Sequence, residues 1–207
     1  MNEEFEYKFS FDDPGLLGRI AADPAVAGAA VPGSWKDQVL ETTYFDTADN
    51  VLQKARLTYR IRLDGTVRVA TVKFGGNTGT DGSHARTELN VEAPEGMPEL
   101  EAFGLNGRSF LERDMRSSEL EPLFVSRTDR LSALLAIHGG GVAEFAADRC
   151  VIEADGGRRM EFFEIELEVK DADKKETGKL AAYLSGKYGL TPEPRSKYAR
   201  GLELLTR

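Results

Sequence analysis

The chain has little of three residue types that often form metal, redox or stacking sites: its 207 residues include one cysteine, two histidines and one tryptophan. The single cysteine, Cys150, excludes an internal disulfide and fits a reducing cytoplasm, which is the expected location. With only His84 and His138 beside it, a zinc site is not expected. We expect Cys150 to be a small buried side chain and both histidines to lie in loops or at the surface.

Long apolar runs are also absent from the sequence. No stretch of about 18 apolar residues occurs, so no membrane-spanning helix is expected. The start, Met1-Asn2-Glu3-Glu4, is acidic and lacks the apolar segment of a secretory signal, so none is expected. We therefore expect no membrane partner.

The formal net charge is −8, from 27 basic and 35 acidic residues. Nucleic-acid binding usually needs a basic face, so this balance argues against a nucleic-acid partner. It does not exclude a small anionic substrate, because local clusters and bound cations can override the net charge. The composition, 41% apolar and 30% charged, is typical of a globular protein, and we expect one domain over residues 1–207.

Hydrophobic periodicity and turn residues predict a chain made mainly of β-strands. The predicted strands are residues 3–11, 36–46, 56–64, 67–75, 84–93, 122–137, 142–155 and 158–170. Predicted helical segments begin at 12–14 and cover 98–120, 173–188 and 196–206, with a short turn or helix at 47–55, an irregular stretch at 23–34 and a flexible glycine-rich loop at 75–83. Many antiparallel strands with few helices favour a closed or nearly closed barrel, which also removes exposed sheet edges.

Two segments near opposite ends of the chain alternate charged and apolar residues. Glu4, Glu6 and Lys8 share one face of the first predicted strand, and Glu164 and Glu166 share one face of the last. Any one such segment is more often a solvated strand with cross-strand ion pairs. Because acidic and basic strands both repeat the pattern, we interpret it as a charged interior.

The residue types in this pattern suit a polyanion and a divalent metal. Guanidinium groups donate paired hydrogen bonds to phosphate oxygens, and Arg60 and Arg62 lie two apart in one predicted strand. Carboxylates are the ligands that Mg²⁺, Mn²⁺ and Ca²⁺ prefer. Two glutamates spaced two apart lie about 6.6 Å from each other along a strand, close enough to hold one ion or bracket two.

These motifs, taken in order, resemble the CYTH superfamily, also called triphosphate tunnel metalloenzymes. The resemblance rests on Glu4-x-Glu6-x-Lys8, Tyr44-Phe45-Asp46-Thr47, Arg60-x-Arg62, Lys73, Arg86-x-Glu88, Asp148, Glu164-x-Glu166 and Ser196-Lys197, and it spans residues 4 to about 202. Glu-x-Glu-x-Lys alone is a weak signal, whereas the ordered series is specific. Asp46 has a structural interpretation as well, as the cap of the turn that follows it.

The resemblance implies an α+β fold, mainly β: an eight-stranded antiparallel β-barrel that forms a tunnel, with helices packed outside. The phosphate-binding residues it implies are Lys8, Arg60, Arg62, Lys73, Arg86, Arg127 and Lys197. The Mg²⁺ or Mn²⁺ ligands it implies are Glu4, Glu6, Asp148, Glu164 and Glu166, and the catalytic set is Glu4, Glu6, Lys8 and Glu88. Arg127 and Arg130 compete for one position on opposite faces of their strand, and we prefer Arg127. Glu168 shares the face of Glu164 and Glu166 and could also point inward.

The expected function is metal-dependent hydrolysis of the terminal phosphate of inorganic triphosphate or of a small organic triphosphate. One alternative is a class IV-type adenylate cyclase, which would share the metal and phosphate residues but would also need an adenine pocket. Another is a non-catalytic polyphosphate-binding module, for which the full acidic set would be redundant. The expected partner is a small-molecule triphosphate or polyphosphate, and the sequence leaves the oligomeric state open, a homodimer included.

Overall fold

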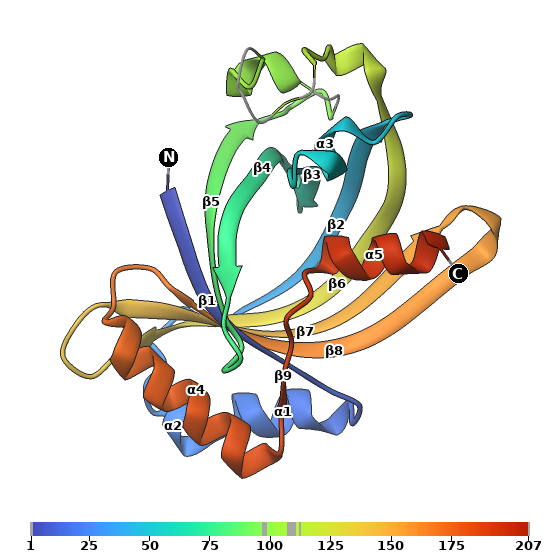
Figure 1. Cartoon of the computed structure of the whole chain (residues 1–207). Helices are drawn as coiled ribbons and strands as arrows, with labels where there is room; N and C mark the ends of the chain where they lie inside the picture. The colour runs from blue at the N-terminus through green and yellow to red at the C-terminus, as the bar shows by residue number, and fades with distance from the viewer. Residues whose placement is uncertain (1, 97–98, 107–110, 112, 207) are drawn as a thin grey trace.

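Eight antiparallel strands close into a barrel in the computed structural model, which describes residues 2–96, 99–106, 111 and 113–206 (Figure 1). The strands are β1 (Asn2–Phe11), β2 (Lys36–Thr47), β3 (Thr58–Asp64), β4 (Val67–Thr78), β5 (Ser83–Glu92), β6 (Leu120–Ala136), β7 (Val142–Ala154) and β8 (Arg158–Val169). Their order around the barrel is β5-β4-β3-β2-β6-β7-β8-β1, and β1 pairs again with β5. The predicted mainly β barrel is confirmed.

Strand β1 completes the closure because both of its edges are paired. One edge pairs with β8, and residues 2–7 of the other edge pair with β5. The short strand β9 (Thr191–Pro192) continues along that second edge at Phe9 and Ser10. The glutamates and lysine of β1 are therefore held between strands from the middle and the end of the chain.

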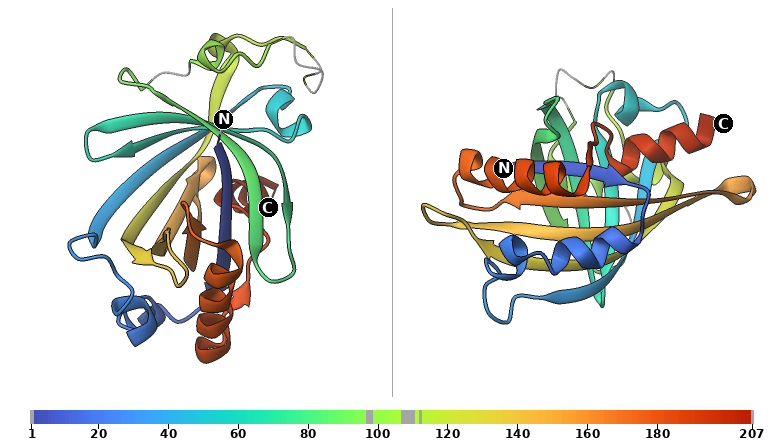
Figure 2. Two further views of the ribbon diagram at one scale, coloured as in Figure 1. Left: turned by 90° about the vertical axis from the view of Figure 1, so that its left-hand side faces the viewer. Right: turned by 90° about the horizontal axis from the view of Figure 1, so that it is seen from below.

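Helices α1 (Gly15–Ala21), α2 (Pro24–Ala27) and α4 (Lys174–Tyr188) lie on one side of the barrel (Figure 2). Ala181 and Leu184 of α4 pack in a buried cluster with Phe9, Ile165 and Leu167. These three barrel residues occupy the odd positions of β1 and β8, between the charged residues. The apolar faces of the two charged strands thus point outward and are covered by helices, as the inverted pattern predicts. Within the described residues, no helix is both long and apolar enough to cross a membrane.

Helix α5 (Lys197–Thr206) packs differently, on the inner, concave side of β7 and β8 (Figure 1). Its Tyr198 and Leu204 form a buried cluster with Tyr44, Phe124 and Cys150. Cys150 lies on the same face of β7 as Asp148, so this apolar cluster borders the charged interior. The helix closes part of the barrel and brings Lys197 inside.

Helix α3 (Val51–Lys54) follows β2 directly, and Asp46 holds its first turn. The Asp46 carboxylate accepts hydrogen bonds from the backbone N–H groups of Thr47 (2.8 Å), Leu52 (2.9 Å) and Gln53 (2.9 Å). The interpretation of Asp46 as the cap of this turn is confirmed.

The predicted helical connector over 98–120 is wrong for the part that the structure describes. It contains only the 3₁₀ turns η1 (Leu100–Phe103) and η2 (Ser117–Glu119), and residues 97–98, 107–110 and 112 lie outside the described residues. Its apolar residues are buried in a cluster with β3 and β4, among them Leu105 and Met115. Packing against the barrel therefore overrides the local helix-forming composition.

Two further predictions about irregular segments need correction. The stretch 23–34 includes the one-turn helix α2, which Asp23 caps through a 2.8 Å bond from the Ala25 N–H. Most of the predicted loop 75–83 belongs to the β4–β5 hairpin, with a register shift between Phe74 and Asn77. Gly75 and Gly76 have φ values of 66° and 108°, a backbone conformation that glycine adopts without strain.

Candidate functional site

The inside of the barrel contains a cavity of about 250 Å³ whose wall is mostly charged. Ten of the residues predicted from the sequence line it: Glu4, Glu6, Lys8, Arg60, Arg62, Lys73, Arg86, Glu88, Glu166 and Lys197. They come from β1, β3, β4, β5, β8 and the start of α5. The structure therefore brings together segments from the first and last tenth of the chain.

Strand register explains why these side chains meet. Lys8 of β1 lies opposite Glu166 of β8, and Glu4 lies opposite Arg86 of β5. Lys73 of β4 lies opposite Glu88 of β5. Side chains alternate between the two faces of a strand, and residues paired across two strands point to the same face. The charged face therefore continues from strand to strand around the inside of the barrel.

Lys8 links the acids of β1 and β8. Its Nζ lies 2.7 Å from Glu6 Oε1 and 3.5 Å from Glu166 Oε1. Burial alone would lower the pKa of Lys8, but Glu6 and Glu166 raise it above its ordinary value. Burial likewise opposes ionisation of Glu6, and the charge of Lys8 outweighs it and lowers the pKa of Glu6. Both groups are therefore charged at neutral pH.

Lys73 makes a second link, between β1 and β5. Its Nζ lies 2.6 Å from Glu4 Oε2 and 2.6 Å from Glu88 Oε2. Burial alone would raise the pKa of Glu88. The charges of Lys73 and Arg60 outweigh burial and lower this pKa to about 2. Glu88 and Glu4 thus hold Lys73 between them.

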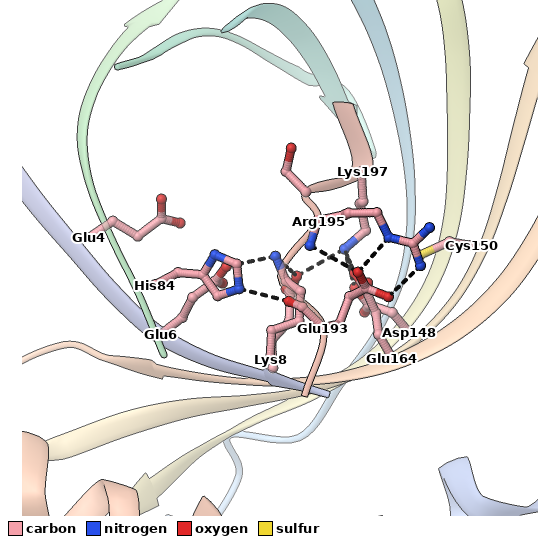
Figure 3. Close-up of polar contacts among 12 residues, drawn as sticks. Glu4, Glu6, Lys8, His84, Asp148, Cys150, Glu164, Glu193, Arg195 and Lys197 are labelled. Carbon is pink, nitrogen blue, oxygen red and sulfur yellow. Dashed lines mark hydrogen bonds and ion pairs between the residues drawn. The ribbon is translucent and has the colours of Figure 1, made fainter. Parts of the chain in front are cut away.

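Lys197, at the start of α5, is surrounded by carboxylates (Figure 3). Its Nζ donates to Asp148 Oδ2 (2.9 Å), Glu166 Oε1 (3.0 Å) and Glu164 Oε1. Asp148 and Glu164 are fully buried beneath Lys197 and do not line the cavity. Burial, together with Glu166 and Asp148, raises the pKa of Glu164 to about 7 against the opposing charge of Lys197.

The opposite wall of the cavity is basic. Among the residues that the structure describes, no ion pair includes Arg60, Arg62 or Arg86. Within the described chain, Arg62 Nε donates to Thr42 Oγ1, at 3.3 Å, and Arg60 Nε is buried without a hydrogen-bond partner. Burial, together with the charges of Arg60 and Arg130, lowers the pKa of Arg62 to about 10. Guanidinium groups without carboxylate partners in one cavity form a site for an anion.

The preference for Arg127 over Arg130 is wrong about which side chain faces the tunnel. Arg127 is 59% exposed and lies 3.5 Å from Asp129 on the outside of β6. Arg130 lines the cavity, where its guanidinium bonds both oxygens of Asp148 (2.8 and 2.6 Å) and Glu166 (2.6 Å). The sequence contains a signal for the inward position of Arg130, because Arg130 shares one face of its strand with the polar residues Ser126, Thr128 and Ser132.

The prediction that His84 lies at the surface is also wrong. His84 is buried, lines the cavity, and has its Nε2 2.8 Å from the backbone oxygen of Glu193. Burial, and then the charge of Lys8, lowers its pKa. Its position two residues before Arg86, on the same face of β5, is the signal that sequence analysis missed. His138 is exposed and Cys150 is buried, as predicted.

Sequence analysis missed two further lining residues, Glu144 of β7 and Lys170, which follows β8. Lys170 Nζ lies 3.0 Å from Glu144 and 2.8 Å from Glu168, and all three line the cavity. Glu168 points inward, as its face of the strand predicts, and Glu144 and Lys170 continue the same alternation. Tyr44 and Tyr198 add aromatic edges to the wall.

The donor set suits a hard divalent cation. Glu4, Glu6 and Glu166 offer carboxylate oxygens at the cavity wall, and the buried Glu164 Oε2 has no hydrogen-bond partner. Within the described chain, ligand atoms of Asp148, Cys150 and Glu164 also lie within 4.8 Å of one another. Burial raises the pKa of the Cys150 thiol well above its ordinary value, so it does not offer a thiolate. An all-oxygen site for Mg²⁺ or Mn²⁺ fits these residues better than a thiolate site.

A closed antiparallel barrel whose interior carries both unpaired guanidinium groups and clustered carboxylates defines a recognisable class of protein. A family model described as the CYTH domain matches residues 3–200, and the chain belongs to this family. A search of curated proteins found no match.

Solved structures of other proteins share the fold. HpAC1 of Hippeastrum, assigned as an adenylyl cyclase and described as having a dominant triphosphatase activity, is 18% identical, with 97% of this chain and 95% of that chain covered and a TM-score of 0.66. A Bacillus halodurans protein assigned as an adenylate cyclase is 17% identical over 95% and 96% of the two chains, with a TM-score of 0.61. The Mimivirus capping enzyme triphosphatase is 12% identical over 92% and 89%, with a TM-score of 0.50. At these identities the likeness shows the fold alone.

Proposed function

We propose that this protein is a divalent-metal-dependent triphosphatase that hydrolyses the terminal phosphate of inorganic triphosphate or of a small organic triphosphate inside the barrel. One observation supports this most strongly. Arg60, Arg62 and Arg86 face the cavity without carboxylate partners among the described residues, while Glu4, Glu6 and Glu166 line the same cavity. A polyanion and a cation would each find their preferred partners there.

The phosphates would be held by the basic residues of the cavity. This set is Lys8, Arg60, Arg62, Lys73, Arg86, Arg130 and Lys197, with Arg130 in place of the outward-facing Arg127. Phosphoryl transfer needs little from a protein beyond positioning and neutralisation of charge, and these side chains supply both. Convergence of several cations also explains how a chain with a net charge of −8 could bind a polyanion.

The proposed metal ligands are Glu4, Glu6, Asp148, Glu164 and Glu166. Mg²⁺ or Mn²⁺ bound there would neutralise phosphate charge and lower the pKa of a coordinated water. The catalytic roles that we propose for Glu4, Glu6, Lys8 and Glu88 follow from their ion pairs. Glu6 stays ionised beside Lys8, and Glu88 and Glu4 fix Lys73 between them.

A second hollow favours an organic triphosphate and keeps the adenylate cyclase as a second candidate. It measures about 240 Å³ and shares Thr58, Lys73, Arg86, Ser196 and Tyr198 with the main cavity. Gln53 and Phe74 also line it, and no acidic residue of the described chain does. An uncharged ring with hydrogen-bonding groups could pack there, next to the phosphates.

Product analysis separates the candidate functions. Purified protein would be incubated with triphosphate, ATP and thiamine triphosphate in the presence of Mg²⁺ or Mn²⁺. Release of orthophosphate supports the triphosphatase, and cyclic AMP with pyrophosphate supports the cyclase. Tight binding without any product would support the non-catalytic polyphosphate-binding module and contradict both enzymes.

Substitution of Glu6 tests the metal assignment. We expect Glu6→Gln to abolish turnover and leave the fold intact, because the amide keeps the shape of the side chain but loses the negative charge. Arg127→Ala is the matched control and should keep the wild-type rate, since Arg127 lies outside the barrel. Turnover is measured as phosphate release, and the fold by circular dichroism. A Glu6→Gln variant with full activity would show that the metal assignment is wrong.

A further inference from the structure

Lys197 uses its whole hydrogen-bonding capacity on carboxylates (Figure 3). A lysine ammonium has three N–H donors. Those of Lys197 contact Asp148, Glu164 and Glu166, one carboxylate from β7 and two from β8. The side chain is only 8% exposed. In this arrangement no donor of Lys197 remains for a phosphate oxygen, although Lys197 lines the cavity.

The three carboxylates are not fully compensated by the cations around them. Arg130 bonds Asp148 and Glu166 but not Glu164, so among the residues that the structure describes Lys197 is the one cation that contacts all three acids. Lys8 approaches Glu166 at 3.5 Å, but it is closer to Glu6, at 2.7 Å. Glu164 Oε2 is buried without a hydrogen-bond partner in the described part of the chain. Such an oxygen is costly unless a cation or a donor can reach it.

Two of the proposed roles therefore compete for the same atoms. Lys197 belongs to the proposed phosphate-binding set, and its three partners belong to the proposed metal-binding set. We infer that the Lys197 ammonium and a divalent cation are alternative occupants of the carboxylates of Asp148, Glu164 and Glu166, so that metal loading frees Lys197 to bind the polyanion. This inference rests on the proposed function, because it concerns the metal and the phosphates of the same site.

The exchange needs no movement of the helix that carries Lys197. Helix α5 is anchored by the ion pair between Glu193 and Arg200 and by Tyr198, which packs on Tyr44 and Phe124. The flexible stem of lysine can rotate while its backbone stays in place. A divalent ion brings two charges to three carboxylates, one oxygen of which has no partner. Metal and polyanion would then each strengthen the binding of the other.

Metal titration without substrate tests the competition. The full chain, treated with a chelator, is titrated with Mn²⁺ by calorimetry as wild type and as Lys197→Met. Removal of the competing ammonium should tighten Mn²⁺ binding by about tenfold or more. The matched control is Lys170→Met, which removes the same charge from between two other carboxylates of the same cavity, Glu144 and Glu168, neither of which is a proposed metal ligand. We expect this control variant to tighten Mn²⁺ binding by less than about threefold, because it changes only the electrostatic potential in the cavity.

Two results would overturn the inference. One is Mn²⁺ binding by Lys197→Met that is no tighter than in the wild type. The other is an equal gain in both variants, which would show a field effect rather than competition for shared ligands. Circular dichroism of each variant confirms that it is folded before its titration is interpreted.

A second measurement uses the wild-type chain, so it stands even where Lys197→Met fails to fold. Acylation of Lys197 by an amine-reactive reagent is followed by mass spectrometry with and without saturating Mn²⁺. We expect the rate at Lys197 to rise several-fold with Mn²⁺, while the exposed Lys179 stays constant as an internal reference. An unchanged rate at Lys197 would contradict the inference. Neither readout uses turnover, so a protein that exchanges Lys197 for metal but hydrolyses no triphosphate would refute the proposed function alone.

Discussion

At the scale of single residues, orientation decides what a charged side chain can do. Arg127 and Arg130 lie three residues apart in β6, and one is solvated while the other bonds two buried or half-buried acids. The same holds for acids. Asp148, Glu164 and Glu166 share one face of neighbouring strands, yet among the described residues Glu166 pairs with three cations and Glu164 with Lys197 alone. These differences in partners set the protonation behaviour of each group.

Glu164 provides a prediction about pH. Its pKa is raised to about 7 from an ordinary value of 4.5, so between these values the folded protein holds a proton that the unfolded chain releases. Ionisation therefore lowers the stability as pH rises from about 4.5 to about 7, and the loss is complete above that range. Glu164→Gln should remove this slope and be more stable than the wild type at pH 8, by on the order of 2 kcal/mol, with little difference at pH 4.5.

Urea denaturation at several pH values measures this effect. Glu153→Gln, at an exposed carboxylate, is the control and should follow the wild type at every pH. If the free energy of unfolding changed with pH in the same way for Glu164→Gln and the wild type, Glu164 would be ionised without penalty in the folded protein. We also expect Glu164→Gln to lose turnover, so a more stable variant would be a less active one.

At the scale of elements, α5 matters most for the site because it carries Lys197 into the barrel. Its position depends on Gly201, which faces the ring of Phe124 at a distance where an added Cβ would overlap the ring. The local sequence predicts a helix at 196–206, and the structure has one at Lys197–Thr206. The close approach to Phe124, some 77 residues earlier, was invisible in the sequence because it arises only when β6 and α5 pack together.

Gly201→Ala should therefore displace α5. We expect a loss of about 1–3 kcal/mol in the free energy of unfolding and a marked fall in turnover, because Lys197 moves with the helix. Gly186→Ala in α4 is the matched control: nothing lies within 4 Å of its added Cβ. That variant should be more stable by about 0.5–1 kcal/mol with unchanged activity. Urea denaturation and phosphate release measure both, and equal behaviour of the two variants would contradict the packing argument.

The connector between β5 and β6 shows the limit of local patterns at this scale. The composition of 98–120 favours a helix, but Leu100, Phe103 and Met115 are buried against the barrel by an irregular path. The β-strands were predicted better because a period of two over many residues is a strong signal, and burial of the apolar face agrees with it.

At the scale of the whole molecule, the charge distribution matters more than its sum. The chain carries −8 overall, but its interior concentrates guanidinium groups that repel one another. Arg62 shows this, because burial and its basic neighbours Arg60 and Arg130 lower its pKa to about 10. A bound polyanion would relieve this repulsion, so ligand binding and folding should be coupled.

Thermal unfolding with tripolyphosphate measures this coupling. At about 100 times the dissociation constant, a ligand stabilises by about 2.7 kcal/mol, which for a chain of this size raises Tm by about 5–10 °C. Arg62→Gln should be at least as stable as the wild type without the anion, and should show less than about half of the wild-type shift with it. Arg127→Gln, outside the barrel, should keep the full shift. An undiminished shift in Arg62→Gln would place the anion elsewhere, and a single transition would support one domain over residues 1–207.

The sequence by itself determined that charged residues of both signs occupy one face of several strands, because the two-residue alternation is a local property of the chain. From that alternation and the ordered motifs followed the barrel, the family and ten of the residues that line the cavity. The same alternation also contains the signals for the inward positions of Arg130 and His84, each on the charged face of its strand. Only the tertiary structure decided that Asp148 and Glu164 lie buried beneath Lys197 and that Gly201 packs against Phe124. The reason is that strand register, barrel closure and the docking of α5 depend on contacts between residues far apart in the sequence, which no local pattern contains.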